Sequence, residues 1–186
     1  MRTGKTLLRL GLAVSVAVGA IPLLESTAWA VGEEKAGPFM GNLKIGPAIR
    51  LDDIPTQFAM EVEIAGALDR GNDAYLGFNP QFQFSDGLAT INLTATFQYD
   101  IELPVKALYL YPKINAGLAI NAPTGRGGDP ALGFALQPEF GIKYQLVEHA
   151  HIGAEPISIP LYLGNNRYIG AIDAQYRLFF YGGFDI

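Results

Sequence analysis

The segment ATINLTATFQYD, from Ala89 to Asp100, alternates between apolar and polar side chains without interruption. A strict period of two places successive side chains on opposite faces of an extended chain, so the segment is predicted to be a β-strand with one apolar and one polar face. The question is which face is enclosed. In a soluble barrel the apolar row fills the core, whereas in a membrane barrel the apolar row meets lipid.

The same alternation recurs along most of the chain and predicts eight strands. Their expected ranges are 41–51, 58–68, 75–84, 88–100, 106–121, 131–146, 151–163 and 168–186. The connections carry turn-forming residues, as in DRGND, SDG and GNNR. Within the seventh strand, EPISIPLY changes parity around Pro156, which indicates a β-bulge. We therefore predict an all-β fold, an eight-stranded antiparallel up-and-down barrel that occupies residues 40–186.

The amino-terminal residues have the pattern of an export signal. Basic residues are followed by the apolar run LGLAVSVAVGAIPLL and then by AWA, which predicts a signal peptide over residues 1–30 that is cleaved after Ala30. The polar stretch VGEEKAGPF is predicted to be a flexible periplasmic tail over residues 31–39. The chain contains no cysteine, so an exported domain must be held together without disulfides, and a closed hydrogen-bonded barrel achieves this.

The polar row of the predicted strands differs from an ordinary water-facing surface. It consists mainly of small residues and amides, whereas a soluble surface would carry many Lys and Glu. Its charged members comprise five of each sign, and they form the predicted lumen charge network: Lys44, Arg50, Lys113, Lys143 and Arg177 with Glu61, Glu63, Glu139, Glu155 and Asp173. A closed interior favours equal numbers of opposite charges, because unpaired buried charge is costly. The polar row is therefore predicted to line the lumen and the apolar row to face lipid, so the predicted fold is an eight-stranded antiparallel up-and-down transmembrane β-barrel.

With its signal peptide, alternating strands, short turns and aromatic final strand, the chain resembles the small eight-stranded β-barrels of the bacterial outer membrane. Members of that class often end in an alternating apolar strand with a terminal Phe, which the barrel-insertion machinery recognises. Here the end is YRLFFYGGFDI, in which Phe184 precedes the terminal Ile186 by two residues. The resemblance implies location in the outer membrane, with outer-membrane lipid and the insertion machinery as partners.

A barrel of eight strands encloses just enough space for its own side chains. The function predicted from the sequence is therefore structural or narrowly porin-like, without catalysis, cofactor or metal. The chain is acidic, with a net charge of −5 that becomes more negative without the signal peptide, so nucleic acid is not expected as a partner.

Two other functions stay open. An outer-membrane enzyme that hydrolyses or transfers lipid acyl chains would need a nucleophile, a base and an acid, for which the candidates are Ser158, His151, with His149 nearby, and Glu155. The alternation puts Ser158 on the opposite face from His151 unless a bulge intervenes. The histidine pair with one carboxylate is only a weak metal signal. The third possibility is a soluble periplasmic carrier of apolar ligands, which would need the apolar row inside.

Overall fold

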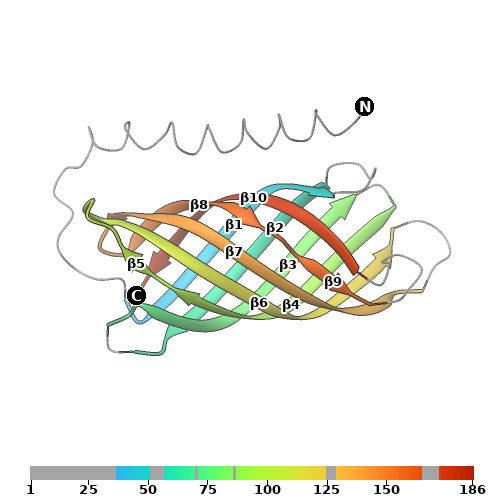
Figure 1. The fold of residues 1–186 in the computed structure, drawn as a ribbon, viewed down its shortest axis with the longest axis horizontal. Helices are drawn as coiled ribbons and strands as arrows, with labels where there is room; N and C mark the ends of the chain where they lie inside the picture. Colours follow the sequence, from blue (N-terminus) through green and yellow to red (C-terminus); the bar gives the residue numbers. More distant parts are fainter. Residues whose placement is uncertain (1–36, 51–56, 70, 86, 125–128, 165–171) are drawn as a thin grey trace.

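The computed structural model describes residues 37–50, 57–69, 71–85, 87–124, 129–164 and 172–186. These residues form strands that wind diagonally around a common axis (Figure 1). The strands are β1 (Phe39–Arg50), β2 (Gln57–Ala67), β3 (Ala74–Ser85), β4 (Leu88–Tyr99), β5 (Ile101–Glu102), β6 (Leu108–Pro123), β7 (Ala131–Val147), β8 (Ala150–Ser158), β9 (Leu161–Leu163) and β10 (Ile172–Asp185). The predicted signal peptide and most of the predicted tail lie outside the described residues.

The strands close into a barrel because β1 pairs with β10, so the first and last strands of the sheet are neighbours. Every pairing is antiparallel. The short β5 follows β4 after one residue, and β9 follows β8 after two, so ten segments make eight barrel strands. The predicted fold class is confirmed, and the strand ranges differ from the predicted ones by a few residues at their ends.

The burial pattern is inverted relative to a soluble protein. Along β4 the polar residues from Asn92 to Gln98 are buried, whereas the alternate residues Leu93 and Phe97 are exposed. Most of the largest fully buried side chains are polar, charged or tyrosine, among them Arg177, Lys44 and Tyr111. An apolar exterior over a polar interior is the arrangement of a membrane barrel. The prediction that the polar row lines the lumen therefore holds.

The seventh barrel strand contains the predicted bulge. Between Glu155 and Ser158, β8 has one more residue than the facing stretches of β7 and β10. The extra residue changes the parity, so both Glu155 and Ser158 face the lumen and are fully buried. On the outer side, the Tyr176 hydroxyl donates a hydrogen bond to the carbonyl of Pro156. This bond satisfies a backbone acceptor at the irregularity, which matters because an unpaired polar group in lipid is costly.

Glycines make room for two inward-facing tyrosines. A Cβ on Gly141 would lie 2.3 Å from the Tyr111 ring, and a Cβ on Gly153 would lie 2.3 Å from the Tyr181 hydroxyl. The two tyrosine rings meet edge to face, with their centroids 6.3 Å apart. These rings fill the lumen near the charged residues described below, which explains why small residues recur in the polar row.

We call the end of the barrel that holds the carboxyl terminus and the start of β1 the terminal end (Figure 1). There, backbone hydrogen bonds of 2.8 Å join Phe39 and Ile186 in both directions. The β2–β3 turn also lies at this end, where the Asp69 carboxylate accepts hydrogen bonds from the backbone N–H groups of Ala74 and Asp73. These bonds hold the pKa of Asp69 below its ordinary value. Among the described residues, no helix is long and apolar enough to cross a membrane.

Candidate functional site in the barrel lumen

Six charged residues meet in the middle of the lumen, and we call them the central cluster: Lys44, Glu61, Glu63, Lys113, Glu139 and Glu155. All six are buried, and the ion-paired side chains have no exposed surface. Lys44 Nζ of β1 lies 2.9 Å from Glu61 Oε1, 2.5 Å from Glu63 Oε2 and 2.5 Å from Glu155 Oε1. The two glutamates of β2 are two residues apart, so the strand period places both in the lumen.

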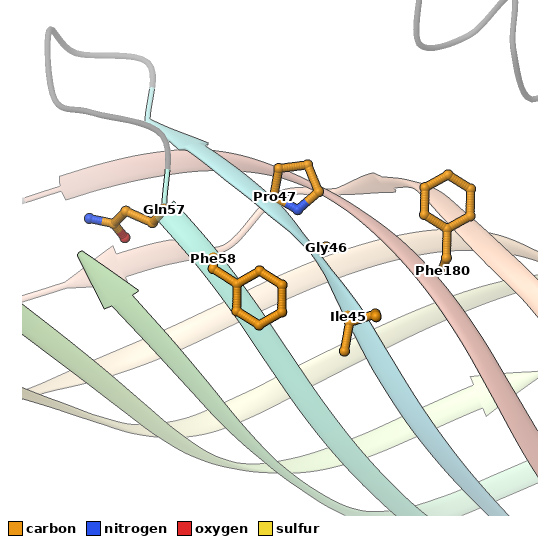
Figure 2. Close-up of a pocket in the computed structure, with 6 residues that line it drawn as sticks. All are labelled: Ile45, Gly46, Pro47, Gln57, Phe58 and Phe180. Atoms are coloured by element: carbon orange, nitrogen blue, oxygen red, sulfur yellow. The ribbon is translucent and has the colours of Figure 1, made fainter.

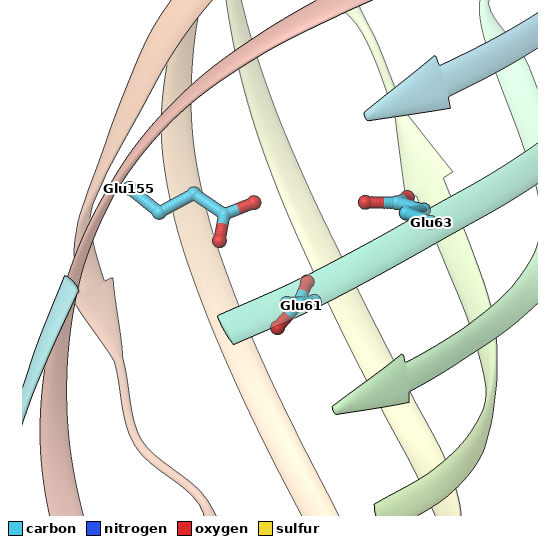
Figure 3. A group of neighbouring side chains, drawn as sticks. All are labelled: Glu61, Glu63 and Glu155. Carbon is cyan, nitrogen blue, oxygen red and sulfur yellow. The ribbon is translucent and has the colours of Figure 1, made fainter. Parts of the chain in front are cut away.

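Lys113 Nζ contacts the same three oxygens from β6. The distances are 3.3 Å to Glu61, 3.2 Å to Glu63 and 2.8 Å to Glu155, and a fourth contact of 2.5 Å reaches Glu139 Oε2. Figure 3 shows the three shared glutamates converging from β2 and β8. Their oxygens therefore form a triangle between two ammonium groups. The central cluster connects opposite walls of the barrel and fills the lumen between them.

Neutral side chains extend the central cluster. The Tyr111 hydroxyl donates to Glu155 Oε1 over 2.9 Å. Asn79 Nδ2 donates to Glu61 Oε1 over 2.7 Å, and Asn115 Nδ2 donates to Glu139 Oε2 over 2.9 Å. Hydrogen bonds to ionised groups are stronger than neutral ones, so these contacts help fix the carboxylates in place.

Glu61, Glu63 and Glu155 are also the kind of group that could hold a metal, since one ligand oxygen of each lies within 4.8 Å of the others. The fit is poor, because two ammonium groups already lie against the same three carboxylates. A divalent ion between them would stand beside two positive charges at hydrogen-bond distance. The donor set therefore suits ammonium groups better than a metal.

A second group of charges lies toward the terminal end. Lys143 pairs with Asp100, and its Nζ lies 5.6 Å from the Tyr75 ring centroid and 5.3 Å from that of Tyr109. These distances are within cation–π range. The ion pair and the two rings together obstruct the lumen near this end.

A buried histidine lies close to this second group. His151 Nδ1 lies 2.8 Å from Asp185 Oδ2, and His151 Nε2 lies 2.6 Å from Asn42 Oδ1. Gln145 also donates to Asp185 over 2.9 Å. The Asp185 carboxylate is thereby fixed inside the barrel and contributes to the closure of this end.

Arg177 lies toward the far end, where β1 and β6 end. Its guanidinium donates to Gln81 Oε1 at 2.6 Å, Gln83 Oε1 at 2.7 Å and Gln137 Oε1 at 3.2 Å, and also to the Tyr162 hydroxyl. Among the described side chains, no carboxylate forms an ion pair with it. Within the described part of the chain, four neutral oxygens therefore solvate its charge.

Eight of the ten residues in the predicted charge network lie buried in the lumen: Lys44, Glu61, Glu63, Lys113, Glu139, Lys143, Glu155 and Arg177. The side chains of Arg50 and Asp173 lie outside the described part. The equal balance of charges does not hold for the described side chains, because Asp100 and Asp185 are also buried. Both fall at strand ends, where alternation alone does not separate lumen from rim.

The candidate catalytic residues do not assemble. The bulge brings Ser158 to the same face as His151, as a catalytic pair would require, but the Ser158 Oγ donates to Glu139 over 2.8 Å and accepts from Gln137 over 3.1 Å. His151 lies seven residues away along β8 and contacts Asp185 and Asn42. His151 is buried, whereas the neighbouring His149 is exposed.

The outer wall carries a shallow apolar groove of about 440 Å³ over β1, β2 and β10. Figure 2 shows Ile45, Pro47, Phe58 and Phe180 around it. The groove lies on the apolar exterior, so it forms part of the surface that faces lipid.

Comparisons with known proteins identify structures with a similar fold. No protein-family model matches the chain, and no curated protein does. Among solved structures, Neisserial surface protein A (NspA) matches with a TM-score of 0.66 at 13% identity, over 82% of this chain and 100% of NspA. The amino-terminal β-barrel domain of Pseudomonas aeruginosa OprF matches with a TM-score of 0.52 at 14% identity, over 82% of this chain and 100% of that domain.

A third likeness is to the outer membrane enzyme PagL, with a TM-score of 0.49 at 13% identity, over 76% of this chain and 97% of PagL. That likeness is too weak to support an inference about activity. The chain thus has the fold of the small eight-stranded outer-membrane barrels, as its sequence indicates, and the function has to be argued from its own residues.

Proposed function

We propose that this protein is a non-catalytic barrel of the bacterial outer membrane whose lumen is closed by its own paired charges, so that its role is structural rather than that of an open pore. The observation that carries the proposal is the central cluster, in which Lys44 and Lys113 hold the same three glutamates across the barrel with no exposed side-chain surface.

Location in a membrane is supported by the exterior. Large apolar residues with roughly half of their surface exposed recur on successive strands, as at Leu43, Phe58, Phe78, Leu118 and Phe180. A soluble protein rarely exposes so continuous an apolar surface. The same exterior argues against a soluble carrier of apolar ligands, because the interior that would hold such a ligand is polar and filled.

Closure of the lumen is supported at three levels. Lys143, Asp100 and two tyrosines lie toward the terminal end, the central cluster lies in the middle, and Arg177 lies with three glutamines and Tyr162 toward the far end. Passage of an ion would require several charge-assisted contacts to break together. A narrow, intermittently conducting lumen is the variant of the proposal that such rearrangement would permit.

Export and assembly follow from the same proposal. The predicted signal peptide would direct the chain out of the cytoplasm, and the final strand would be recognised by the insertion machinery. In support, Phe180, Phe184 and Ile186 are exposed on the outer face of β10 and the terminus after it, whereas Asp185 is buried between them. The lipid-facing row therefore continues to the last residue.

An acyl hydrolase or transferase is not favoured. Ser158 contacts Glu139 and Gln137, and the base that would activate it, His151, contacts Asp185 and Asn42. A general base has to lie within hydrogen-bond reach of its nucleophile. The described residues contain no such pair at these positions, so the non-catalytic function is the one the geometry supports.

The test is single-channel conductance in planar bilayers. Mature protein from Val31 is refolded in detergent, and folding is verified by heat-dependent gel mobility. We expect no discrete steps from the wild-type barrel. The variant Lys44→Ala/Glu155→Ala, combined with Lys143→Ala and Arg177→Ala so that long side chains are removed at all three levels, serves as the opened control and should conduct. Regular, ion-dependent conductance steps from the wild type would show that the lumen is a narrow pore and not closed. Solubility of the folded protein without detergent would overturn the membrane location.

A further inference from the structure

The central cluster has more negative than positive groups. Four carboxylates, from Glu61, Glu63, Glu139 and Glu155, meet the two ammonium groups of Lys44 and Lys113. With every group ionised, the cluster would carry two unbalanced negative charges. Uncompensated charge in a closed interior of low polarity is costly, and ionisable groups avoid the cost by changing their protonation.

The other buried cations in the described part of the chain, Lys143 and Arg177, are engaged elsewhere. Lys143 pairs with Asp100 toward the terminal end. Arg177 is solvated by glutamine and tyrosine oxygens toward the far end, and among the described side chains it is linked to the central cluster through Gln137, which also contacts Glu139. Tyr111 and Tyr181, which border the cluster from β6 and β10, are neutral donors. The excess of negative charge is therefore not removed by the described neighbours.

The hydrogen-bonding groups of the interior are also unbalanced, because unpaired acceptors outnumber unpaired donors. Of thirteen buried side-chain atoms without a hydrogen-bond partner among the described residues, ten are oxygens. Three of these are the second oxygens of Glu61, Glu63 and Glu155. The carbonyl oxygens of Asn79 and Asn115 are two more, and their amide groups are held against Glu61 and Glu139. The interior around the cluster is thus rich in acceptors and poor in donors.

We propose that the central cluster is a proton-binding site, in which about two protons taken from solution convert glutamate carboxylates into carboxylic acids while both lysines stay charged. Each bound proton cancels one negative charge. Each also turns an acceptor into an O–H donor, for which the unpaired oxygens of Asn79 and Asn115 are suitable partners. Proton binding thereby removes both the excess negative charge and the shortage of hydrogen-bond donors. The neutral cluster is the stable form of the closed lumen.

A proton suits the site better than an alkali ion does. The triangle of Glu61, Glu63 and Glu155 already has an ammonium group on each side, so a metal ion would meet two like charges within hydrogen-bond distances. A proton binds to a single oxygen and needs no additional space. The inference rests on the proposed function, in which the lumen is closed around the central cluster. Proton binding would still be possible if the lumen conducted ions intermittently.

The experiment is infrared spectroscopy of the folded barrel in lipid vesicles. Protonated carboxyls give a C=O band separate from that of carboxylates, and its shift in heavy water identifies exchangeable protons. We expect the wild type at neutral pH to show a band equivalent to about two carboxylic acids. Glu139→Gln should lose about half of it, and Glu63→Gln/Glu139→Gln should lose nearly all. Glu102→Gln, at an exposed residue of β5, is the matched control and should leave the band unchanged.

Absence of this band from folded wild-type protein at neutral pH would overturn the proposal, as would a band that persists in full in the double variant. If the double variant fails to fold, the comparison of Glu139→Gln with Glu102→Gln decides alone. A second arm replaces potassium and sodium with N-methylglucamine. A drop in thermal stability on replacement, without the carboxylic acid band, would assign the missing charge to an alkali ion and also overturn the proposal. Conductance tests the closed lumen separately, so failure of one proposal is distinguishable from failure of the other.

Discussion

Lys44 and Lys113 contact the same three glutamate oxygens from opposite walls of the barrel, because β1 and β6 are four strands apart in a closed ring of eight. A salt bridge between neighbouring strands would only reinforce an existing pairing. This shared contact instead ties together strands that have no backbone hydrogen bonds to each other. The central cluster therefore acts as an internal cross-brace as well as a plug.

Removal of Lys113 should destabilise the barrel strongly. Lys113→Met leaves four glutamates with one lysine, and breaking a buried ion pair from one side costs about 3–5 kcal/mol. The free energy of unfolding, measured by urea titration in lipid vesicles, should fall by that amount. Lys106→Met, at an exposed residue between β5 and β6, is the control and should change stability by less than about 0.5 kcal/mol. Equal effects of the two substitutions would mean that the central cluster is solvated.

Removal of Arg177 should cost less than removal of Lys113, although both cations are fully buried. Arg177→Met leaves glutamine and tyrosine oxygens without their donor but uncovers no described carboxylate. A buried polar group without a partner costs about 1–3 kcal/mol, and rotation of the glutamine amides recovers part of it. The same urea titration should rank Lys113→Met above Arg177→Met. The reverse order would indicate that Arg177 balances a carboxylate after all.

Alternation alone predicts much of this structure. The row from Ala89 to Asp100 predicts the strand, its two faces and, with the amide-rich polar rows elsewhere, which face is inside. A strand period also places Glu61 and Glu63 on the same side of β2. Even the bulge at Pro156 is visible as a change of parity in the sequence. These features are local, since each depends on a few consecutive residues.

The contacts across the lumen could not be predicted in this way. Strand tilt and stagger determine which residues meet across a barrel, and neither can be derived from the alternation within one strand. Lys113 therefore could not be assigned to Glu61, nor Arg177 to Gln81. The burial of Asp185 and His151 was not predicted for another reason: the two residues lie near the chain terminus and a turn, where exposure is the usual expectation. Pairing of β10 with both β1 and β8 buries them instead.

A charge on the outer face should be costly only within the membrane. Leu93 lies in the middle of β4 with its side chain exposed, and Leu93→Arg should lower the free energy of unfolding by about 2–4 kcal/mol in vesicles. Val105→Arg makes the same type of change at an exposed apolar residue outside the strands and should be almost neutral. Comparable losses in both variants, or in neither, would contradict the assignment of Leu93 to a lipid-facing surface.

Two adjacent glycines of β10 provide the most closely matched test of interior packing. A Cβ on Gly183 would lie 2.1 Å from Asn42 Oδ1 and 2.3 Å from His151 Nε2, whereas a Cβ on Gly182 would meet nothing within 4 Å. Gly183→Ala should therefore displace the histidine from its contacts, and overpacking of this kind costs about 1–3 kcal/mol.

Gly182→Ala places the same methyl group on the outer face and should leave stability within about 0.5 kcal/mol of the wild type. The pair is compared by urea titration, and the imidazole NMR signals of His151 report whether its environment changes. Both variants replace a glycine with alanine in the same strand. The difference in their stability therefore reports only whether the added methyl group points into the lumen or outward. If Gly183→Ala is as stable as Gly182→Ala and the His151 signals stay in place, then the terminal end of the lumen is more open than the contacts of His151 with Asn42 and Asp185 indicate.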